Sequence, residues 1–558
     1  MTHPRAKSLP LLSVDLLHPF KSAYDRLVRP YSSEVLVIIL LSFISYGFLG
    51  YNHLYAGDDW VWVVESGNIS YHFIGIGRWV QVLLFSILSG NAYAPAFTLS
   101  ILVAGLLLAG IIACDTIGIR SRQGFFMFNS LFIFSPFWIE DFVLKSNHAN
   151  IGFGVVFASL CARIIWRESE SVISGEKTVL KTIPALLVSC ILFSLSASCF
   201  QTLTPIIAVI FLLAYLNRLI RNIDVKDPRM YGLPFIPLSF VFFLGLMVYS
   251  ANVHISQGLT GIGSSYEVDY LITSTLISSQ GDLYFTINRF MGHFSQFMFK
   301  SQHLMPLWIK IVFIIGYIAL LGTVFSSIKR SSPVPARVYS GLVILLLLFL
   351  IFMTPWLLGL IRMPRITYRY TGLVALSLVH AGLFVIAIED NKTPLFRSLL
   401  QILGFLVIIG FIFQNNIASS VVSTNNVRDL ALAQRIIGRI EAHPGYDSFS
   451  RQGHLTLLQI GEPAWSEDHP FAAHATDPPM DASVVDFKVY DGLRGMRFPL
   501  ILLSSEGLQY YVNRYPGLDR VAEPSVRAEA RKMKEWPSKE SLKVLDDGRV
   551  ILLFSRGD

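Results

Sequence analysis

Hydrophobic segments long enough to cross a lipid bilayer recur through the first three quarters of this chain of 558 residues. A helix needs about 20 mostly apolar residues to span the hydrocarbon core. Only 15% of the residues are charged, whereas 53% are hydrophobic, so we expect a polytopic α-helical membrane protein. By apolar length we predict about eleven spans, at 35–49, 95–114, 125–138, 151–166, 183–198, 205–219, 233–250, 306–324, 341–360, 371–388 and 399–413.

Lysine and arginine near the ends of these segments predict their orientation. Cytoplasmic loops carry an excess of both residues, and here the N-terminal tail and every second loop after it are rich in them. The N-terminus is therefore predicted in the cytoplasm, and an odd number of spans places the C-terminus outside it. This distribution explains the net charge of +7 without nucleic-acid binding. The predicted inner loops carry Arg120, Arg122, Arg163, Arg167, Lys177, Lys181, Arg218, Arg221, Lys226, Arg229, Lys329, Arg330, Arg337, Lys392 and Arg397.

The sequence divides into three predicted parts. Residues 1–33 form a cytoplasmic tail whose alternating apolar and basic residues suit a helix on the membrane surface, or else a disordered tail. Residues 34–417 form the transmembrane domain. Residues 418–558 form a small α/β domain outside the cytoplasm, with a helix at 427–442 and strands at 454–460 and 498–503. A hairpin is predicted at 541–554. All four cysteines lie in or beside the spans, where they suit core packing.

Several charged residues gather in the predicted outer loops. Adjacent carboxylates, Asp58 and Asp59, follow the first span, and charge at membrane depth usually marks a site. Arg78 follows in the same loop, ahead of an apolar stretch at 79–88 that is too short to cross a bilayer. The residues of interest in the second outer loop are Glu140, Asp141, Lys145 and His148.

One outer loop breaks the charge rule. Arg362, Arg365 and Arg369 lie between the ninth and tenth predicted spans, close to Pro364 and Tyr368. Three arginines outside the cytoplasm oppose the topology, so a bound anion is expected to compensate. Arginine suits bidentate phosphate binding, and we favour a ligand phosphate over the alternative of lipid headgroup anchoring.

These motifs together resemble those of a known enzyme family. Gly57-Asp58-Asp59-Trp60, Gly77-Arg78-Trp79, Arg365 and Tyr368-Arg369 carry the likeness, with Trp536-Pro537-Ser538 near the C-terminus. The layout resembles the GT-C membrane glycosyltransferases, and the local sequence is similar to the GtrII-type bacterial glucosyltransferases that modify O-antigen. The resemblance implies a GT-C-like fold in the bacterial inner membrane. It also implies transfer of a sugar, usually glucose, from a polyprenyl phosphate to O-antigen or a related glycan in the periplasm, with inversion.

The resemblance suggests roles for the charged residues. Asp58 or Asp59 is the expected general base and its neighbour a supporting residue, although Asp59 could instead cap a helix. Glu140 and Asp141 would bind sugar hydroxyls or assist the base, or else belong to a solvated loop end. Candidate phosphate or sugar ligands are Arg78, Lys145, His148, Arg362, Arg365, Tyr368 and Arg369. His148 could instead be a hydrogen-bonded structural residue.

No cofactor is expected, although Asp58, Asp59, Glu140 and His148 leave a divalent metal open. The expected partners are the lipid-linked donor, the glycan acceptor and membrane lipids. The alternatives are a lipid or glycan transporter (a flippase) and another membrane transferase. A transporter would place ionisable residues inside its spans and show repeated halves, and neither pattern is clear.

Overall fold

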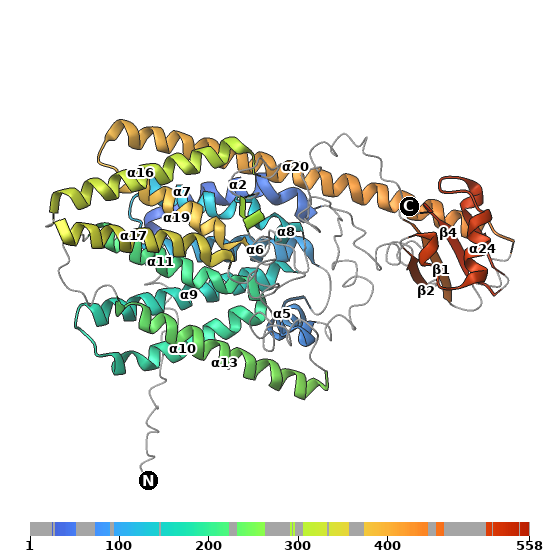
Figure 1. Cartoon of the computed structure of the whole chain (residues 1–558), viewed down its shortest axis with the longest axis horizontal. Coiled ribbons are helices and arrows are strands. Elements are labelled where there is room, and N and C mark those ends of the chain that lie inside the picture. The colour runs from blue at the N-terminus through green and yellow to red at the C-terminus, as the bar shows by residue number, and fades with distance from the viewer. Residues whose placement is uncertain are drawn as a thin grey trace, which may run out of the picture.

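The chain folds into a bundle of long helices, and one of these helices continues out of the bundle to a small β-sheet (Figure 1). The computed structural model describes residues 25, 28–51, 73–89, 94–143, 147–221, 232–262, 291–292, 294–295, 305–331, 334–356, 373–444, 454–461, 509–515, 517–545 and 547–556. The bundle helices are α2 (Ser32–Tyr51), α5 (Trp79–Ser89), α6 (Pro95–Ile117), α7 (Arg122–Ile133), α8 (Ile139–Val143), α9 (His148–Ile173), α10 (Val179–Cys199), α11 (Thr204–Arg221), α13 (Phe235–Thr260), α16 (Leu307–Ser331), α17 (Val334–Met353), α19 (Ala375–Glu389) and α20 (Pro394–Glu441). Short 3₁₀ turns connect some of them: η1 (Arg29–Tyr31), η2 (Pro136–Trp138), η4 (Gln201–Leu203) and η5 (Thr354–Trp356).

In the part of the chain that the structure describes, each predicted apolar segment overlaps one of these helices. Within the described residues, eight helices are long and apolar enough to cross a membrane, which makes this a polytopic membrane protein. α19 is apolar but shorter, so the count of eleven spans stays a prediction. The stretch at 79–88 forms the short helix α5, which packs against α9 and α10. The predicted tail helix lies outside the described residues.

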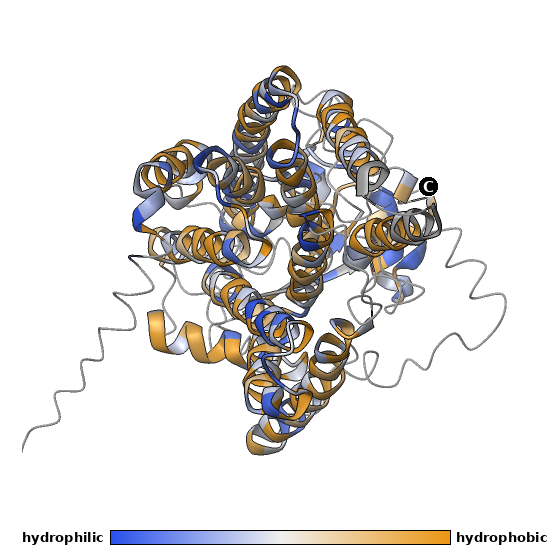
Figure 2. Ribbon diagram, turned by 90° about the vertical axis from the view of Figure 1, so that its left-hand side faces the viewer, coloured by the Kyte–Doolittle hydropathy of each residue, from blue (hydrophilic) through white to orange (hydrophobic). Residues whose placement is uncertain are grey.

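Burial separates central helices from peripheral ones. In α11, 89% of the span is buried, compared with 28% in α13 and in α20. Residues 375–388 of α19 are all buried as well. The outer helices expose apolar side chains such as Phe243 and Ile318, which suit a lipid environment. Figure 2 looks along the bundle and shows hydrophobic residues on helices all around its circumference.

Glycines allow the central helices to approach closely. A Cβ added to Gly105 of α6 would collide with the carbonyl group of Gly152 in α9. Small residues at helix crossings bring backbones into van der Waals contact, which drives association where lipid removes the hydrophobic contrast. This crossing holds α6 and α9 together near the start of α9, one turn from His148.

We expect Gly105→Ala to destabilise the protein by about 1–3 kcal/mol, because two backbones must move apart to admit the methyl group. Gly322→Ala in α16 is the control, because no atom lies within 4 Å of its added Cβ. Alanine favours helix over glycine, so the control should unfold at the same temperature as the wild type or higher. Thermal unfolding in detergent measures both. Equal stability of the two variants would contradict the close crossing.

The C-terminal part contains a four-stranded sheet with strand order β2-β1-β4-β3. β1 pairs in parallel with β2 and β4, whereas β3 and β4 are antiparallel. One face packs against the last turns of α20, and the other against α24. The elements are β1 (His454–Ile460), β2 (Gln509–Tyr515), α24 (Pro524–Lys532), β3 (Leu542–Val544) and β4 (Val550–Leu553), with the 3₁₀ turns η9 (Leu518–Arg520) and η10 (Lys539–Ser541).

Sequence analysis predicted part of this sheet. The strand at 454–460 and the hairpin at 541–554 are confirmed, whereas β2 and α24 were not predicted. The strand predicted at 498–503 lies outside the described residues. The helix predicted at 427–442 is the end of α20, which passes through position 418 without a break. The boundary predicted there therefore lies within one continuous helix.

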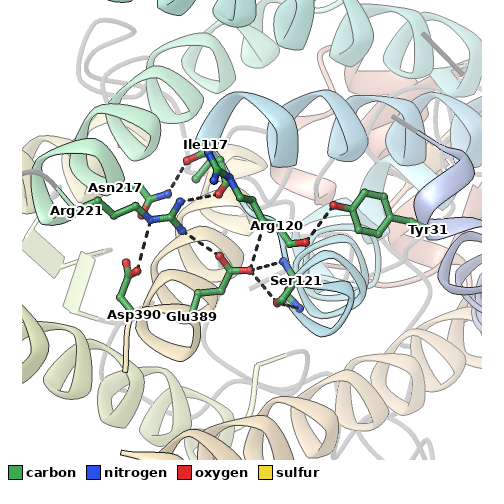
Figure 3. Close-up of polar contacts among 10 residues, drawn as sticks. Tyr31, Ile117, Arg120, Ser121, Asn217, Arg221, Glu389 and Asp390 are labelled. Atoms are coloured by element: carbon green, nitrogen blue, oxygen red, sulfur yellow. Dashed lines mark hydrogen bonds and ion pairs between the residues drawn. The ribbon is translucent and has the colours of Figure 1, made fainter. Parts of the chain in front are cut away.

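An ion-pair network closes one end of the bundle (Figure 3). Glu389, at the end of α19, accepts hydrogen bonds from the backbone N–H of Ser121 at 3.0 Å and from its hydroxyl at 2.8 Å. Arg221, at the end of α11, donates to Glu389 at 3.1 Å and pairs with Asp390 at 3.5 Å. Burial raises the pKa of Asp390, and the charge of Arg221 opposes that shift.

The same network reaches α6, because Arg221 also donates to the Gly118 carbonyl group at 3.1 Å. The Tyr31 hydroxyl donates to the Arg120 carbonyl group at 3.2 Å and so joins the start of α2. Arg120 and Arg221, which were both predicted in cytoplasmic loops, therefore lie together at this end of the bundle. The opposite end of these helices is where the candidate site lies.

Candidate functional site

Three of the predicted site residues, Arg78, Asp141 and His148, have side chains that the structure describes. Helix direction places them at the end opposite the Arg221 network. α9 starts at His148 and runs towards Glu170, which pairs with Arg218 in the last turn of α11. Figure 1 shows α5 and α8 at the end of the bundle from which α20 projects. The residues outside the description are Asp58, Asp59, Lys145, Arg362, Arg365, Tyr368, Arg369 and the side chain of Glu140.

The turn before α5 fixes the guanidinium group of Arg78. Its Nε donates to Gln201 Oε1 at 3.0 Å, and the guanidinium carbon lies 4.1 Å from the centre of the Phe200 ring. Gln201 comes from η4, in the tight connection between α10 and α11. A cation over an aromatic face gains electrostatic energy, and the hydrogen bond sets its orientation. Arg78 is thus held in one geometry before any ligand binds.

The same glutamine holds the turn itself. Gln201 Nε2 donates to the Ile76 carbonyl group at 2.7 Å and to the Tyr249 hydroxyl at 3.0 Å. Gly77 has φ +81°, and a Cβ there would lie 2.5 Å from the Tyr249 hydroxyl. Only glycine fits this position, because other residues would be strained in that conformation and would also collide. The Gly77-Arg78 pair is therefore built around Gln201 and Tyr249.

A second group of residues lies on α8 and at the start of α9. Asp141 is completely buried, so the alternative of a solvated loop end is wrong for this residue. A buried carboxylate is costly unless the surrounding protein compensates its charge. His148 is also buried, and its Nε2 donates to the Phe142 carbonyl group at 2.9 Å while Nδ1 lies 3.4 Å from the Thr98 hydroxyl. These contacts favour the structural role for His148, which ties α8 to α9.

One hydrogen bond joins the two groups. Gln81 in α5 donates through Nε2 to Asn147 Oδ1 at 2.9 Å. Gln81 lies one turn after Arg78, and Asn147 directly precedes His148. Arg78 and the α8–α9 group therefore belong to one neighbourhood.

Contacts with α2 and α20 hold α8 in place. Tyr46 of α2 stacks on Phe142 with ring centroids 3.5 Å apart, and its hydroxyl donates to the Ile133 carbonyl group at 2.9 Å. Asn415 of α20 donates to the Tyr46 hydroxyl at 2.9 Å and to the Phe134 carbonyl group at 3.0 Å. α8 and its acidic residues are thus anchored to the first and last long helices of the bundle.

The arrangement suits recognition of an anion or a hydroxylated ligand. It combines an oriented guanidinium group, a buried carboxylate and side-chain amides at one end of an apolar bundle, and Arg78 can bind phosphate oxygens. Within the described residues, no three His, Cys, Asp or Glu side chains are arranged to hold a metal ion. Sequence reasoning did not assign Gln201, Tyr249, Gln81 or Asn147. The one available signal was the polar Gln201 between two apolar segments that nearly touch.

Comparison with known proteins identifies the family. No curated protein and no solved structure matches the chain significantly. The sequence model of the family described as Glucosyl transferase GtrII matches residues 47–409. This match covers more than half of the chain and includes the Asp58-Asp59 loop, the Arg78 turn, α8 and most of the bundle. The chain therefore belongs to the GtrII glucosyl transferase family and is a glycosyltransferase embedded in a membrane.

Proposed function

We propose that this protein transfers glucose from a polyprenyl phosphate to O-antigen or a related surface glycan at the periplasmic face of the bacterial inner membrane. The family match carries this proposal, because it covers the acidic pair Asp58-Asp59 and the turn that holds Arg78. A lipid-linked donor suits a reaction site bordered by membrane helices, since its tail stays in lipid while its head reaches the site.

The proposed reaction inverts the anomeric carbon in one displacement. Asp58 or Asp59 takes the proton of the acceptor hydroxyl, and the acceptor oxygen bonds to C1 of the sugar as the bond from C1 to the phosphate oxygen breaks. The polyprenyl phosphate leaves with that oxygen and its electron pair, and arginine side chains stabilise its charge. Arg365 and Arg369 are proposed for this role, with Arg78 on the sugar or phosphate side.

The decisive experiment adds purified protein in detergent to undecaprenyl phosphoglucose and a lipopolysaccharide acceptor. We expect the acceptor to gain a hexose, seen by mass spectrometry, and undecaprenyl phosphate to be released in equal amount. Boiled protein is the control. Movement of the lipid across a vesicle membrane without sugar transfer would instead support the flippase alternative. No hexose gain with an active, folded preparation would contradict the proposal.

The proposed site requires the C-terminus to lie in the periplasm and the N-terminus in the cytoplasm, as the lysine and arginine distribution predicts. Alkaline phosphatase fused after Asp558 should therefore be active in bacteria, because it folds only outside the cytoplasm. Green fluorescent protein at the same position, exported unfolded, should stay dark. Fluorescence with an inactive phosphatase would place the C-terminus inside and show that the number of spans is even.

A further inference from the structure

A single lysine lies inside the apolar span of α16. Lys310 is the only charged residue between Leu307 and Ser326, and it is 4% exposed. A lysine one turn from a helix end commonly extends its ammonium group to the membrane surface. This side chain is buried in the protein, and ionisable residues within a membrane span usually mark a binding or transport site.

Lys310 lines a small cavity together with Tyr317 and His380. The Tyr317 hydroxyl and His380 Nδ1 share a hydrogen bond. When the hydroxyl donates to Nδ1, the neutral imidazole carries its proton on Nε2 and offers a second donor. Phe313 stacks on the imidazole with ring centroids 4.5 Å apart, and Phe137 stacks with centroids 5.9 Å apart. The polar groups are therefore fixed within an apolar wall.

The residues that line the cavity include both core residues and residues on the exposed side of α16. His380 is 5% exposed, whereas Ile314, which lines the same cavity, is 38% exposed. Ile314 belongs to an exposed apolar stripe along α16, which also contains Leu307, Ile311 and Ile318. An apolar chain lying on this stripe would bring its head to the cavity mouth.

The cavity is also close to the candidate site. Phe137, in its wall, belongs to η2, which continues directly into α8 and Asp141. An ammonium group beside the neutral N–H donor of His380 favours an anion, and an ammonium is a common phosphate ligand. The ligand class that fits is an amphiphile with a phosphate head and a long apolar chain.

We propose that Lys310 and His380, with His380 oriented by Tyr317, form a binding site for the phosphate of a polyprenyl phosphate, at the membrane-facing edge of the reaction site. The identity of this lipid rests on the proposed function, whereas the anionic head is inferred from Lys310 and His380 and the apolar chain from the exposed stripe of α16. The site would hold the lipid phosphate as the donor arrives or as the product leaves.

Native mass spectrometry of the full chain in detergent tests this, with undecaprenyl phosphate and phosphatidylglycerol present in equal amounts and no sugar or acceptor. We expect preferential binding of undecaprenyl phosphate. Lys310→Met should weaken it by about tenfold or more, the size of a lost charge-assisted contact. Lys310→Arg should retain most of it. Lys392→Met is the control, because Lys392 is exposed and follows α19 at the opposite end of the bundle.

Unchanged undecaprenyl phosphate binding in folded Lys310→Met would overturn the site. An equal loss of both lipids would also overturn it, by assigning the cavity to any phospholipid head. If Lys310→Met does not insert into the membrane, Tyr317→Phe is tested in its place. Undecaprenyl phosphate binding at the wild-type level in Tyr317→Phe would contradict the site. Lys310-dependent binding without glucose transfer by the wild type would overturn the proposed function alone.

Discussion

Changing Asp58 or Asp59 to asparagine is expected to lower the turnover number by about 10²- to 10⁴-fold at whichever residue is the base. Asparagine has nearly the same shape but cannot accept the proton of the acceptor hydroxyl, so folding and membrane insertion should persist. The other variant should lose less activity, because a supporting hydrogen bond can survive the change.

Initial rates at saturating donor and acceptor measure this effect, with the amount of membrane-inserted protein determined in parallel. Glu65→Gln is the matched control, since it removes one carboxylate from the same loop. We expect this control to retain most of its activity. Full activity in both Asp58→Asn and Asp59→Asn would rule out this pair as the source of the base and direct attention to Glu140 and Asp141.

Replacement of Arg365 or Arg369 by alanine is expected to raise the KM for the lipid donor by about tenfold or more, with a smaller change for the acceptor. Their charge opposes the predicted topology, and a donor phosphate would explain why it is retained. Arg→Lys keeps the charge but loses the planar pair of donors, so it should weaken donor use as well, to a lesser degree.

The measurement is the initial rate against donor concentration in detergent for both alanine and both lysine variants. Arg122→Ala is the control, because Arg122 is exposed and lies at the Arg221 end of the bundle. Unchanged donor dependence in all four variants would assign these arginines to lipid headgroup anchoring. The donor phosphate would then be sought near Arg78, whose guanidinium group is already oriented by Gln201.

The helices of the bundle could be predicted because bilayer thickness imposes a minimum length on each apolar segment. The sheet was harder to predict, because its strand order depends on pairing between segments that are far apart in the sequence. β2 pairs with β1 across more than 40 residues of chain, and Gln509, Asn513 and Arg514 interrupt its hydrophobic pattern. α24 has nine residues, of which Val526 and Ala530 are buried. So short a pattern carries little periodic signal.

The candidate site could also be predicted only in part from local sequence patterns. Arg78 could be selected because it is charged and lies between a glycine and a tryptophan in a predicted outer loop. Gln201, Lys310 and His380 are single polar residues in or beside apolar segments, and their meaning depends on what packs against them. Gln201 becomes informative only when the fold brings it to Ile76, Arg78 and Tyr249. That information lies in tertiary contacts, so a local pattern does not contain it.

α20 joins the bundle to the sheet as one unbroken helix. Its 48 residues form a rod about 72 Å long at about 1.5 Å per residue, and the part beyond Ser420 alone measures about 30 Å. Asn415 clamps the rod beside α8, and Ile436 and Ile440 fasten its far end into the sheet. Because one continuous helix joins the bundle to the sheet, the length of that helix sets the separation between them.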